Sequence, residues 1–388
     1  MATCGIRSFA YGFLSVILGL YLAAIGLEAE AIGWVFAAAL AGGAVMTIVL
    51  TTVADRLGRK ELLMLGAGLM ALAGAAFAIY SNFVLLLIAS VLGTISPSGK
   101  EVGPFLSIEQ AILPQTTQDE NRTGVFAAYN LVGSFASALG ALGVSMVALF
   151  ELPPLTGYRL LIWGYVAAAI ILLVLFSCLS PSAEVRLAKD HRIGFGLHRS
   201  RGIVARLASL FALDSFAGGL IVQSLVAYWF HLRYGADIKA LGSIFFGANL
   251  FSALSFLAAP ALARRIGLLN TMVSTHLLSN LMLIAVPFMP TYGSTIGMFI
   301  ARHLLSQLDV PTRQSYTMAV VGAAERAAAA GITSVSRNAA AAVAPIFTGV
   351  AVATPALGLP FLLAGGLKIV YDLSIFAVFR KVKPPEES

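Results

Sequence analysis

Long apolar runs separated by short polar segments dominate this sequence. Twelve of these runs have the length of a helix, and in chain order they are 6–26, 31–53, 62–80, 83–108, 123–150, 158–180, 205–232, 238–262, 268–289, 293–318, 327–352 and 356–379. A helix needs about 20 mostly apolar residues to cross the hydrocarbon core of a bilayer. The pattern therefore predicts an all-α membrane protein with twelve transmembrane helices.

The composition excludes a soluble protein and gives no support for an enzyme. Of the 388 residues, 59% are hydrophobic and 11% are charged, whereas soluble domains have about 45–50% apolar and about 25% charged residues. Two cysteines, Cys4 and Cys178, are too few for a disulfide framework or a four-ligand metal site. The sequence contains no glycine-rich phosphate loop, metalloprotease pattern or nucleophile elbow, so we expect neither catalysis nor a cofactor.

Most lysines and arginines fall on one side of the predicted membrane topology. Sixteen of them share the side of the two termini, whereas the opposite loops contain only Arg159, Arg233 and Lys239. Cytoplasmic loops carry an excess of Lys and Arg, so we expect a protein of the inner (cell) membrane with both termini in the cytoplasm. The net charge of +7 then follows from topology in a lipid bilayer and does not indicate nucleic-acid binding.

The two halves of the chain carry similar segments in the same order. The matched pairs are 7–12 and 214–219, 56–58 and 265–267, 88–90 and 300–302, and Arg122 and Arg326. Four matches at nearly one spacing indicate a duplication of six helices. We therefore expect two pseudo-symmetric six-helix bundles, at 1–180 and 204–388, joined by a cytoplasmic linker at 181–203. In such an arrangement the substrate binds between the halves near mid-membrane.

A short charged turn follows the second apolar run. Its sequence is Asp55-Arg56-Leu57-Gly58-Arg59-Lys60. The glycine allows a tight turn, and the carboxylate and the cations can pair across neighbouring helix ends. Placed after the second span of a duplicated twelve-span chain, this turn resembles the signature loop of the major facilitator superfamily. The family pattern begins with Gly four residues before the Asp, where this sequence has Thr51.

The resemblance implies a secondary transporter. In that family the loop holds together the two sides of one half at the cytoplasmic face, so Asp55, Arg56, Gly58 and Arg59 would form a gating loop. Two other family motifs depart from the pattern. Ser90 stands where many proton-coupled drug exporters carry an arginine, although its repeat mate is Arg302, and the fifth span lacks the proline of antiporters. Antiport of a drug against protons therefore stays one option among several.

Charged side chains inside spans are costly and normally face a cavity or a partner. Lys368 and Asp372 are four residues apart on one helix, and Asp309 and Arg313 have the same spacing. This spacing predicts two structural ion pairs. Pro311 lies within the second pair and should bend or break that helix.

Other charged residues within the spans have no obvious partner nearby. Lys100 and Glu101 lie in a stretch rich in proline and glycine, 96–104, which predicts a broken helix that lines a cavity or ends in a loop. Arg302 and Arg337 have no carboxylate at helical spacing. They would either pair with carboxylates of other helices or bind an anionic substrate in two-point geometry.

Two charges of opposite sign occupy equivalent repeat positions, Arg7 and Asp214. We hypothesise that they interact, directly or through substrate, and that Asp214 exchanges the coupling proton. Alternatively, Arg7 reaches the cytoplasmic interface and Asp214 bonds to a neighbouring helix. The remaining candidates face either a cavity or another helix, and they are Tyr129, Asn130, Gln223 and His303. Of these, only the histidine could exchange a proton near neutral pH.

These features predict a monomeric carrier that moves a small molecule by alternating access. Coupling to protons or another ion is expected, and export of a small organic solute is the favoured direction. One alternative is transport or exchange of an organic or inorganic anion that binds to the intramembrane arginines. A second alternative is a channel or a membrane scaffold.

Overall fold

The computed structural model describes residues 1–100, 105, 108–109, 122–179, 200–321, 325–352 and 358–380, and these are helical with short connections. In the first half the helices are α1 (Ala2–Ala24), α2 (Ala29–Leu57), α3 (Arg59–Ile79), α4 (Phe83–Leu92), α6 (Arg122–Val147), the 3-10 turn η3 (Ala148–Phe150) and α7 (Pro154–Ser177). In the second half they are α8 (Arg201–Gly219), α9 (Gln223–Tyr234), α10 (Ile238–Ile266), α11 (Leu268–Ala285), the 3-10 turn η5 (Val286–Phe288), α12 (Tyr292–His303), α13 (Asp309–Val320), α14 (Arg326–Val352) and α15 (Leu359–Phe379). The predicted all-α class is confirmed.

Nine stretches within the described residues are long and apolar enough to cross a membrane. They are α1, α2, α3, α6, α7, the stretch Arg201–Tyr234 with α8 and α9, α10, α11 with η5, and α15. The other three predicted runs, 83–108, 293–318 and 327–352, contain helices that fall short of this length or hydropathy within the described residues. The count of twelve spans thus stays a prediction for those three runs.

The chain divides into two compact units. Unit 1 comprises Met1–Lys189 and Val222–Phe246, and unit 2 comprises Asp190–Ile221 and Gly247–Ser388. Unit 1 therefore contains α1 to α7, α9 and the beginning of α10, and unit 2 contains the remaining helices. The residues 180–199, which include most of the predicted linker, lie outside the described part of the chain.

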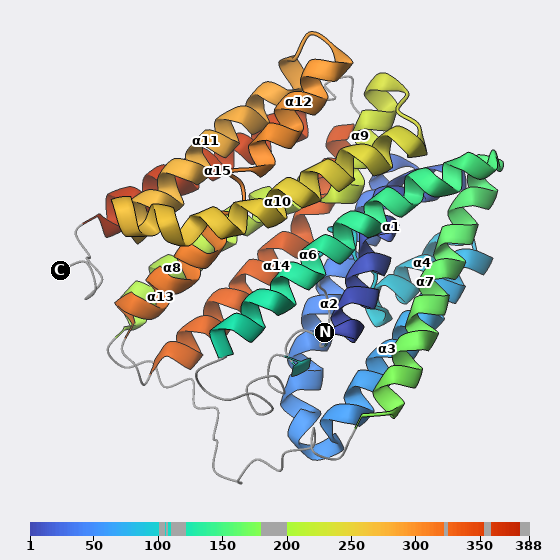
Figure 1. The fold of residues 1–388 in the computed structure, drawn as a ribbon, viewed down its shortest axis with the longest axis horizontal. Coiled ribbons are helices and arrows are strands. Elements are labelled where there is room, and N and C mark those ends of the chain that lie inside the picture. Colours follow the sequence, from blue (N-terminus) through green and yellow to red (C-terminus); the bar gives the residue numbers. More distant parts are fainter. Residues whose placement is uncertain are drawn as a thin grey trace. The chain divides into compact units, whose positions relative to one another are not determined.

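In unit 1, α1 is the central helix. It packs against α6, α7 and α9, and nearly all of its side chains beyond Ser8 are buried. Gly12 and Gly140 allow α1 and α6 to approach closely, because a side chain at either position would collide with the backbone of the other helix. On the outer side of the unit, α3 and α7 run side by side (Figure 1).

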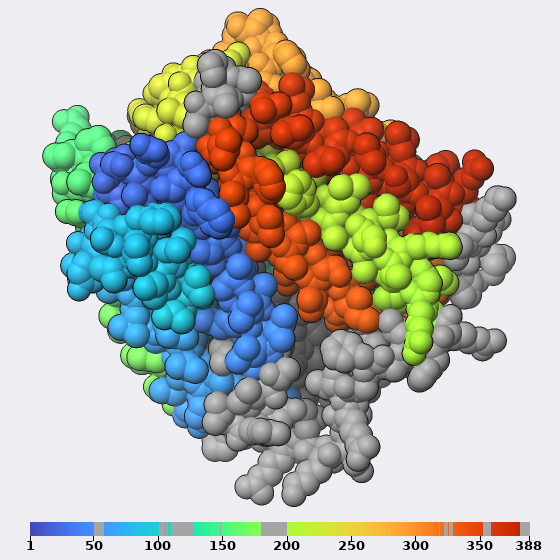
Figure 2. Space-filling view, turned by 180° about the vertical axis from the view of Figure 1, so that it is seen from behind, coloured from blue at the N-terminus to red at the C-terminus, as the bar shows by residue number. Residues whose placement is uncertain are grey.

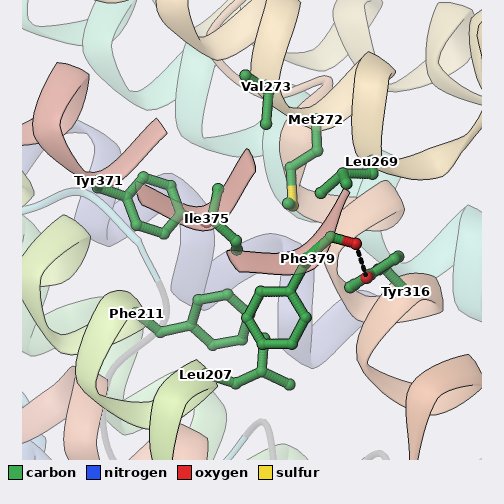
Figure 3. Packing of buried hydrophobic residues seen from close by; sticks show 9 residues of the cluster. All are labelled: Leu207, Phe211, Leu269, Met272, Val273, Tyr316, Tyr371, Ile375 and Phe379. Carbon is green, nitrogen blue, oxygen red and sulfur yellow. Dashed lines mark hydrogen bonds between the residues drawn. The ribbon is translucent and has the colours of Figure 1, made fainter. Parts of the chain in front are cut away.

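In unit 2, α8 packs along α14, and Figure 2 shows these two helices in contact. Unit 2 also contains an apolar cluster, and Figure 3 shows its side chains converging from four helices. Its buried members are Leu207 and Phe211 of α8, Leu269, Met272 and Val273 of α11, Tyr316 of α13, and Tyr371, Ile375 and Phe379 of α15. The cluster joins four of the helices that carry the charged residues described below.

Three of the predicted spans are broken helices. The helix of 83–108 ends at Leu92, and residues 93–100 form a bend with Gly99 at φ 68°, as the prolines and glycines of this stretch predict. The run 293–318 is interrupted at 304–308, just before Pro311 in the first turn of α13. The run 205–232 is interrupted at 220–222, which the sequence analysis did not predict. There Gly219 lies too close to the main chain of Ala341 for any larger residue.

Features of the predicted repeat recur at equivalent places. Gly58 joins α2 to α3 with φ 92°, and Gly267 joins α10 to α11 with φ 85°. Positive φ values are costly for residues with a side chain, so glycine suits both turns. In addition, α6 begins at Arg122 and α14 begins at Arg326. These local similarities support the duplication inferred from the sequence.

Candidate functional site

The largest group of buried charges lies in unit 2 and centres on Asp214 of α8. One of its carboxylate oxygens, Oδ1, accepts a hydrogen bond from Lys368 Nζ of α15 at 2.5 Å. The other, Oδ2, accepts one from Arg313 Nη1 of α13 at 3.1 Å. His276 Nε2 of α11 lies 3.6 Å from Oδ1. Because only 5% of Asp214 is exposed, these cations and the imidazole take the place of water around its charge.

A second carboxylate, Asp372 of α15, bonds to the other side of the same imidazole. Its Oδ1 lies 2.7 Å from His276 Nδ1, and its Oδ2 accepts a hydrogen bond from Asn280 Nδ2 at 2.9 Å. Asn280 Nδ2 also lies 3.2 Å from His276 Nδ1. Asp372 is fully buried. His276 therefore connects two carboxylates that belong to different helices.

Two further residues, Asp309 and Arg337, complete this group. Asp309 Oδ2 lies 3.1 Å from Arg313 Nη1, and the Arg313 guanidinium also covers the ring of Phe211 at 5.5 Å. Arg337 of α14 donates from Nε to Ser215 Oγ at 3.1 Å, next to Asp214 in the chain. We call the set Asp214, His276, Asp309, Arg313, Arg337, Lys368 and Asp372 the unit 2 cluster. Its three carboxylates and three permanent cations balance when His276 is neutral.

Helical spacing explains how α11 and α13 each contribute two polar side chains to this region. His276 and Asn280 are one turn apart on α11, so both reach the same face of α15. Asp309 and Arg313 are one turn apart on α13, and the predicted pair between them is confirmed. Arg313 additionally reaches Asp214, which extends the pair to a second helix.

The predicted pair between Lys368 and Asp372 is wrong. Lys368 Nζ bonds to Oδ1 of Asp214 and lies 3.4 Å from its main-chain oxygen. Asp372 bonds to His276 and Asn280 instead. Each of the two groups therefore pairs with a side chain of another helix, Lys368 with α8 and Asp372 with α11.

Unit 1 contains a smaller charged site around Arg7. Its guanidinium binds Glu109 in two-point geometry, with Nη1–Oε1 at 3.1 Å and Nη2–Oε2 at 2.8 Å. Tyr129 Oη donates to Glu109 Oε2 at 2.6 Å, and Thr3 Oγ1 donates to Oε1 at 2.8 Å. The Arg7 guanidinium lies 4.6 Å from the ring centre of Phe105. We call Thr3, Arg7, Phe105, Glu109 and Tyr129 the unit 1 cluster.

The unit 1 cluster bears on the hypothesis for Arg7 and Asp214. Arg7 is fully buried, so the alternative in which it reaches the cytoplasmic interface is wrong. Its charge is matched by Glu109 within unit 1, and the charge of Asp214 is matched by Lys368 and Arg313 within unit 2. Each of the two repeat-equivalent residues therefore has a partner in its own unit.

The other candidates from the sequence lie in several places. Lys100 is exposed and Asn130 is exposed, whereas Gln223 Nε2 donates to Ser15 Oγ of α1 at 2.8 Å within unit 1. His303 Nδ1 lies 2.7 Å from Phe299 O of its own helix. Arg302 is only 8% exposed, and its Nε has no hydrogen-bond partner among the described residues. Glu101 lies outside the described residues.

The gating loop is described only in part. Gly58 has the positive φ expected of a tight turn, and Arg59 is buried at the first position of α3. Asp55 and Arg56 lie on the last turns of α2, and their side chains lie outside the described part of the structure. The turn itself is thus as predicted, while the role of its charges stays a prediction.

Sequence reasoning missed His276, which lies between Asp214 and Asp372, and Asn280, which donates a hydrogen bond to Asp372. A polar pair at i,i+4 in an otherwise apolar run was the available signal. Glu109 is 102 residues from its partner Arg7 in the chain, so no local signal related the two. Among the described residues, no group of three His, Cys, Asp or Glu side chains is arranged to hold a metal ion.

Comparison with known proteins matches the chain to one family. The model of the Major Facilitator Superfamily matches residues 2–306. A membrane protein of Saccharomyces cerevisiae described as uncharacterized is 27% identical over 414 residues, which cover 97% of this chain and 92% of that protein. The yeast protein extends the similarity over almost the whole chain.

Solved structures of transporters have a similar fold. The nucleoside transporter NupG is 17% identical with a TM-score of 0.77, and 98% of each chain is covered. A D-xylose–proton symporter is 15% identical with a TM-score of 0.77, covering 100% of this chain and 97% of the other. The human organic anion transporter MFSD10 is 17% identical with a TM-score of 0.61, covering 96% and 97%.

Proposed function

Because the chain belongs to the major facilitator superfamily, and is therefore a multi-pass membrane transporter and not an enzyme, we propose that it is a proton-coupled secondary transporter. It moves a small organic solute by alternating access, and the favoured direction is export. The bundles 1–180 and 204–388 move as a monomer around a substrate site, and the cytoplasmic linker 181–203 connects them. Both termini lie in the cytoplasm.

The observation that supports proton coupling is the position of His276 between Asp214 and Asp372. Ionisable residues inside membrane spans are costly and commonly belong to ion or substrate pathways. Imidazole gains and loses a proton in the physiological pH range. His276 is bonded to Asp372 at 2.7 Å and lies 3.6 Å from Asp214, so a proton taken up by its ring would lie between two carboxylates.

Flux into proteoliposomes tests this function. Purified protein is reconstituted, and a panel of radiolabelled nucleosides, sugars, organic cations and organic anions is offered with and without an imposed pH gradient. A proton-coupled carrier accumulates one class only when the gradient is present, and it catalyses exchange of that class without a gradient. A channel would instead pass current without saturation, and a scaffold would move none of the panel.

A second candidate function is transport of an anion. The buried Arg302 guanidinium, whose Nε lacks a partner among the described residues, favours it, because a buried charge needs a counter-charge from the protein or from a ligand. Guanidinium also binds carboxylate and phosphate in two-point geometry. If this function holds, Arg302→Lys weakens uptake of the organic anions in the panel, whereas the melting temperature without solute is unchanged. Transport restricted to neutral or cationic solutes would exclude it.

A further inference from the structure

We propose that the coupling proton is held by the His276–Asp372 pair, and that Asp214 remains a carboxylate throughout the transport cycle. This inference rests on the proposed proton coupling and deepens it by assigning the proton to particular atoms. It gives Asp214, which the sequence suggested as the coupling acid, the different role of holding the cations of the unit 2 cluster.

Asp214 is poorly suited to bind a proton because both of its oxygens already bind cations. Lys368 Nζ lies 2.5 Å from Oδ1, and Arg313 Nη1 lies 3.1 Å from Oδ2. Protonation of Asp214 would leave an ammonium and a guanidinium buried with less counter-charge, which is strongly unfavourable. We infer that these two cations keep Asp214 ionised.

Asp372 has the opposite surroundings. Its oxygens contact an imidazole nitrogen at 2.7 Å and an amide nitrogen at 2.9 Å, and neither group carries a permanent positive charge. Lys368, one turn away on the same helix, is bonded to Asp214 instead. A fully buried carboxylate without a permanent cation is stabilised by a proton on itself or on its neighbour. The pair formed by Asp372 and His276 is therefore a site for one proton.

Charged and titratable groups from every neighbouring helix define this site. Asp214 faces it from α8, and Lys368 and Tyr371 face it from α15, with the Tyr371 ring 5.8 Å from the imidazole. From α13, Asp309 and Arg313 neutralise each other. Arg302 lies on α12, and its main-chain oxygen accepts a hydrogen bond from Ser279 of α11. Arg337 lies on α14 and donates to Ser215, the neighbour of Asp214 in the chain. None of these cations is bonded to Asp372.

The geometry also links proton uptake to an ion pair. A doubly protonated imidazole donates from Nδ1 to Asp372 and points its Nε2–H at Asp214 Oδ1, 3.6 Å away. This is the same oxygen that binds Lys368. Uptake of one proton thus adds one positive charge and sets His276 in competition with Lys368 for Asp214. Release of that proton restores the Lys368–Asp214 pair, so proton binding alters the contact between α8 and α15.

Proton binding by the full-length protein tests the assignment without a transported solute. The chain has five histidines, and their ring nitrogens are labelled with ¹⁵N and followed by nuclear magnetic resonance in phosphatidylglycerol nanodiscs as the pH is varied. His276→Gln identifies the signal of His276. We expect that signal to respond reversibly to pH, and the response to change when Asp372→Asn removes the carboxylate bonded to Nδ1.

Three further variants keep this test informative. His231→Gln removes a histidine that lies 2.9 Å from the main-chain oxygen of Ala236 in unit 1, and it should leave the His276 titration unchanged. If His276→Gln does not fold, His231→Gln and His303→Gln assign the signals of two other histidines and so narrow the assignment of His276. Asp372→Glu keeps a carboxylate at this position and should keep the response of His276 to pH. A His276 signal that does not titrate, or that titrates identically in Asp372→Asn, would overturn the proposal.

The outcome is separable from that of the proposed function. If the His276 signal responds to pH as expected but flux does not depend on the pH gradient, proton coupling is refuted and the proton site is retained. Flux driven by the pH gradient together with a silent His276 would refute the site but keep the coupling.

Discussion

The unit 1 cluster and the unit 2 cluster differ in whether their protonation can change. In unit 1, one guanidinium meets one carboxylate in two-point geometry, and two hydroxyl groups and an aromatic ring complete it. In unit 2, six charges and a histidine link α8, α11, α13, α14 and α15. Arg7 and Asp214, at equivalent repeat positions, anchor the two clusters with opposite charge. One half thus contains a self-sufficient pair, and the other contains a group whose protonation can vary.

This difference indicates a division of roles between the two halves. A closed pair with all its hydrogen bonds made stabilises helix packing and has nothing further to bind. A cluster that shares one imidazole between two carboxylates can respond to pH. We therefore expect unit 1 substitutions to change stability alone, and unit 2 substitutions to change both stability and coupling.

The largest effect is expected for Asp214→Asn. It leaves Lys368 and Arg313 buried with less counter-charge, so the free energy of unfolding should fall by about 3–5 kcal/mol. Thermal melting in detergent measures the change. The double variant Asp214→Asn with Lys368→Met, which removes one charge of each sign, should recover part of it. A double variant no more stable than the single one would contradict the ion-pair account.

A smaller effect is expected for Glu109→Gln in the unit 1 cluster. The amide keeps one acceptor oxygen for Arg7 but loses the charge, so stability should fall by about 2–3 kcal/mol. The pH dependence of flux should be unchanged, unlike that of Asp372→Asn, which should abolish the effect of the pH gradient. Proteoliposome flux at several pH gradients compares the two variants. Loss of coupling in Glu109→Gln would contradict the division of roles.

The equivalent turns at Gly58 and Gly267 provide a symmetric comparison. Alanine at either position must adopt a positive φ with an extended ψ, a conformation suited to glycine, which costs about 1–3 kcal/mol. We expect similar losses of melting temperature from Gly58→Ala and Gly267→Ala. The control is Gly68→Ala on α3, where a Cβ meets nothing within 4 Å and stability should be unchanged or higher. If Gly58→Ala lowers transport much more than it lowers stability, and Gly267→Ala does not, the result would support the gating role of the loop at Gly58.

The smallest effects are expected for the neutral donors of the two clusters. Thr3→Ala removes one hydrogen bond to Glu109, and Asn280→Ala removes one to Asp372. Each should cost about 0.5–1.5 kcal/mol in melting experiments. Asn280→Ala should cost more, because Asp372 has no permanent cation to replace the lost donor. The reverse order would indicate that a proton resides permanently on Asp372.

Local patterns predicted the features that depend on neighbours in sequence. The apolar runs predicted the helices, the spacing of Asp309 and Arg313 predicted their pair, and the turn at Gly58 has the predicted conformation. Prolines and glycines near Gly99 predicted the break after α4. Each of these depends on interactions within a few residues, which the sequence displays directly.

Features that depend on distant partners were not predictable in the same way. His276 and Asp372 are 96 residues apart, and no local signal relates them. The same spacing rule that succeeded for Asp309 and Arg313 failed for Lys368 and Asp372, because closer partners on α8 and α11 were available. The break at 220–222 likewise lies beside a distant segment, because Gly219 approaches the main chain of Ala341 of α14.

The balance of three carboxylates against three cations in the unit 2 cluster has an electrical consequence. A proton added to a neutral cluster is a full net charge, so a transport cycle that carries one proton with a neutral solute moves charge across the membrane. A potential of 100 mV changes the free energy of that step by about 2.3 kcal/mol. Voltage alone, at equal pH on both sides, would then drive solute movement, and the cycle would produce a measurable current.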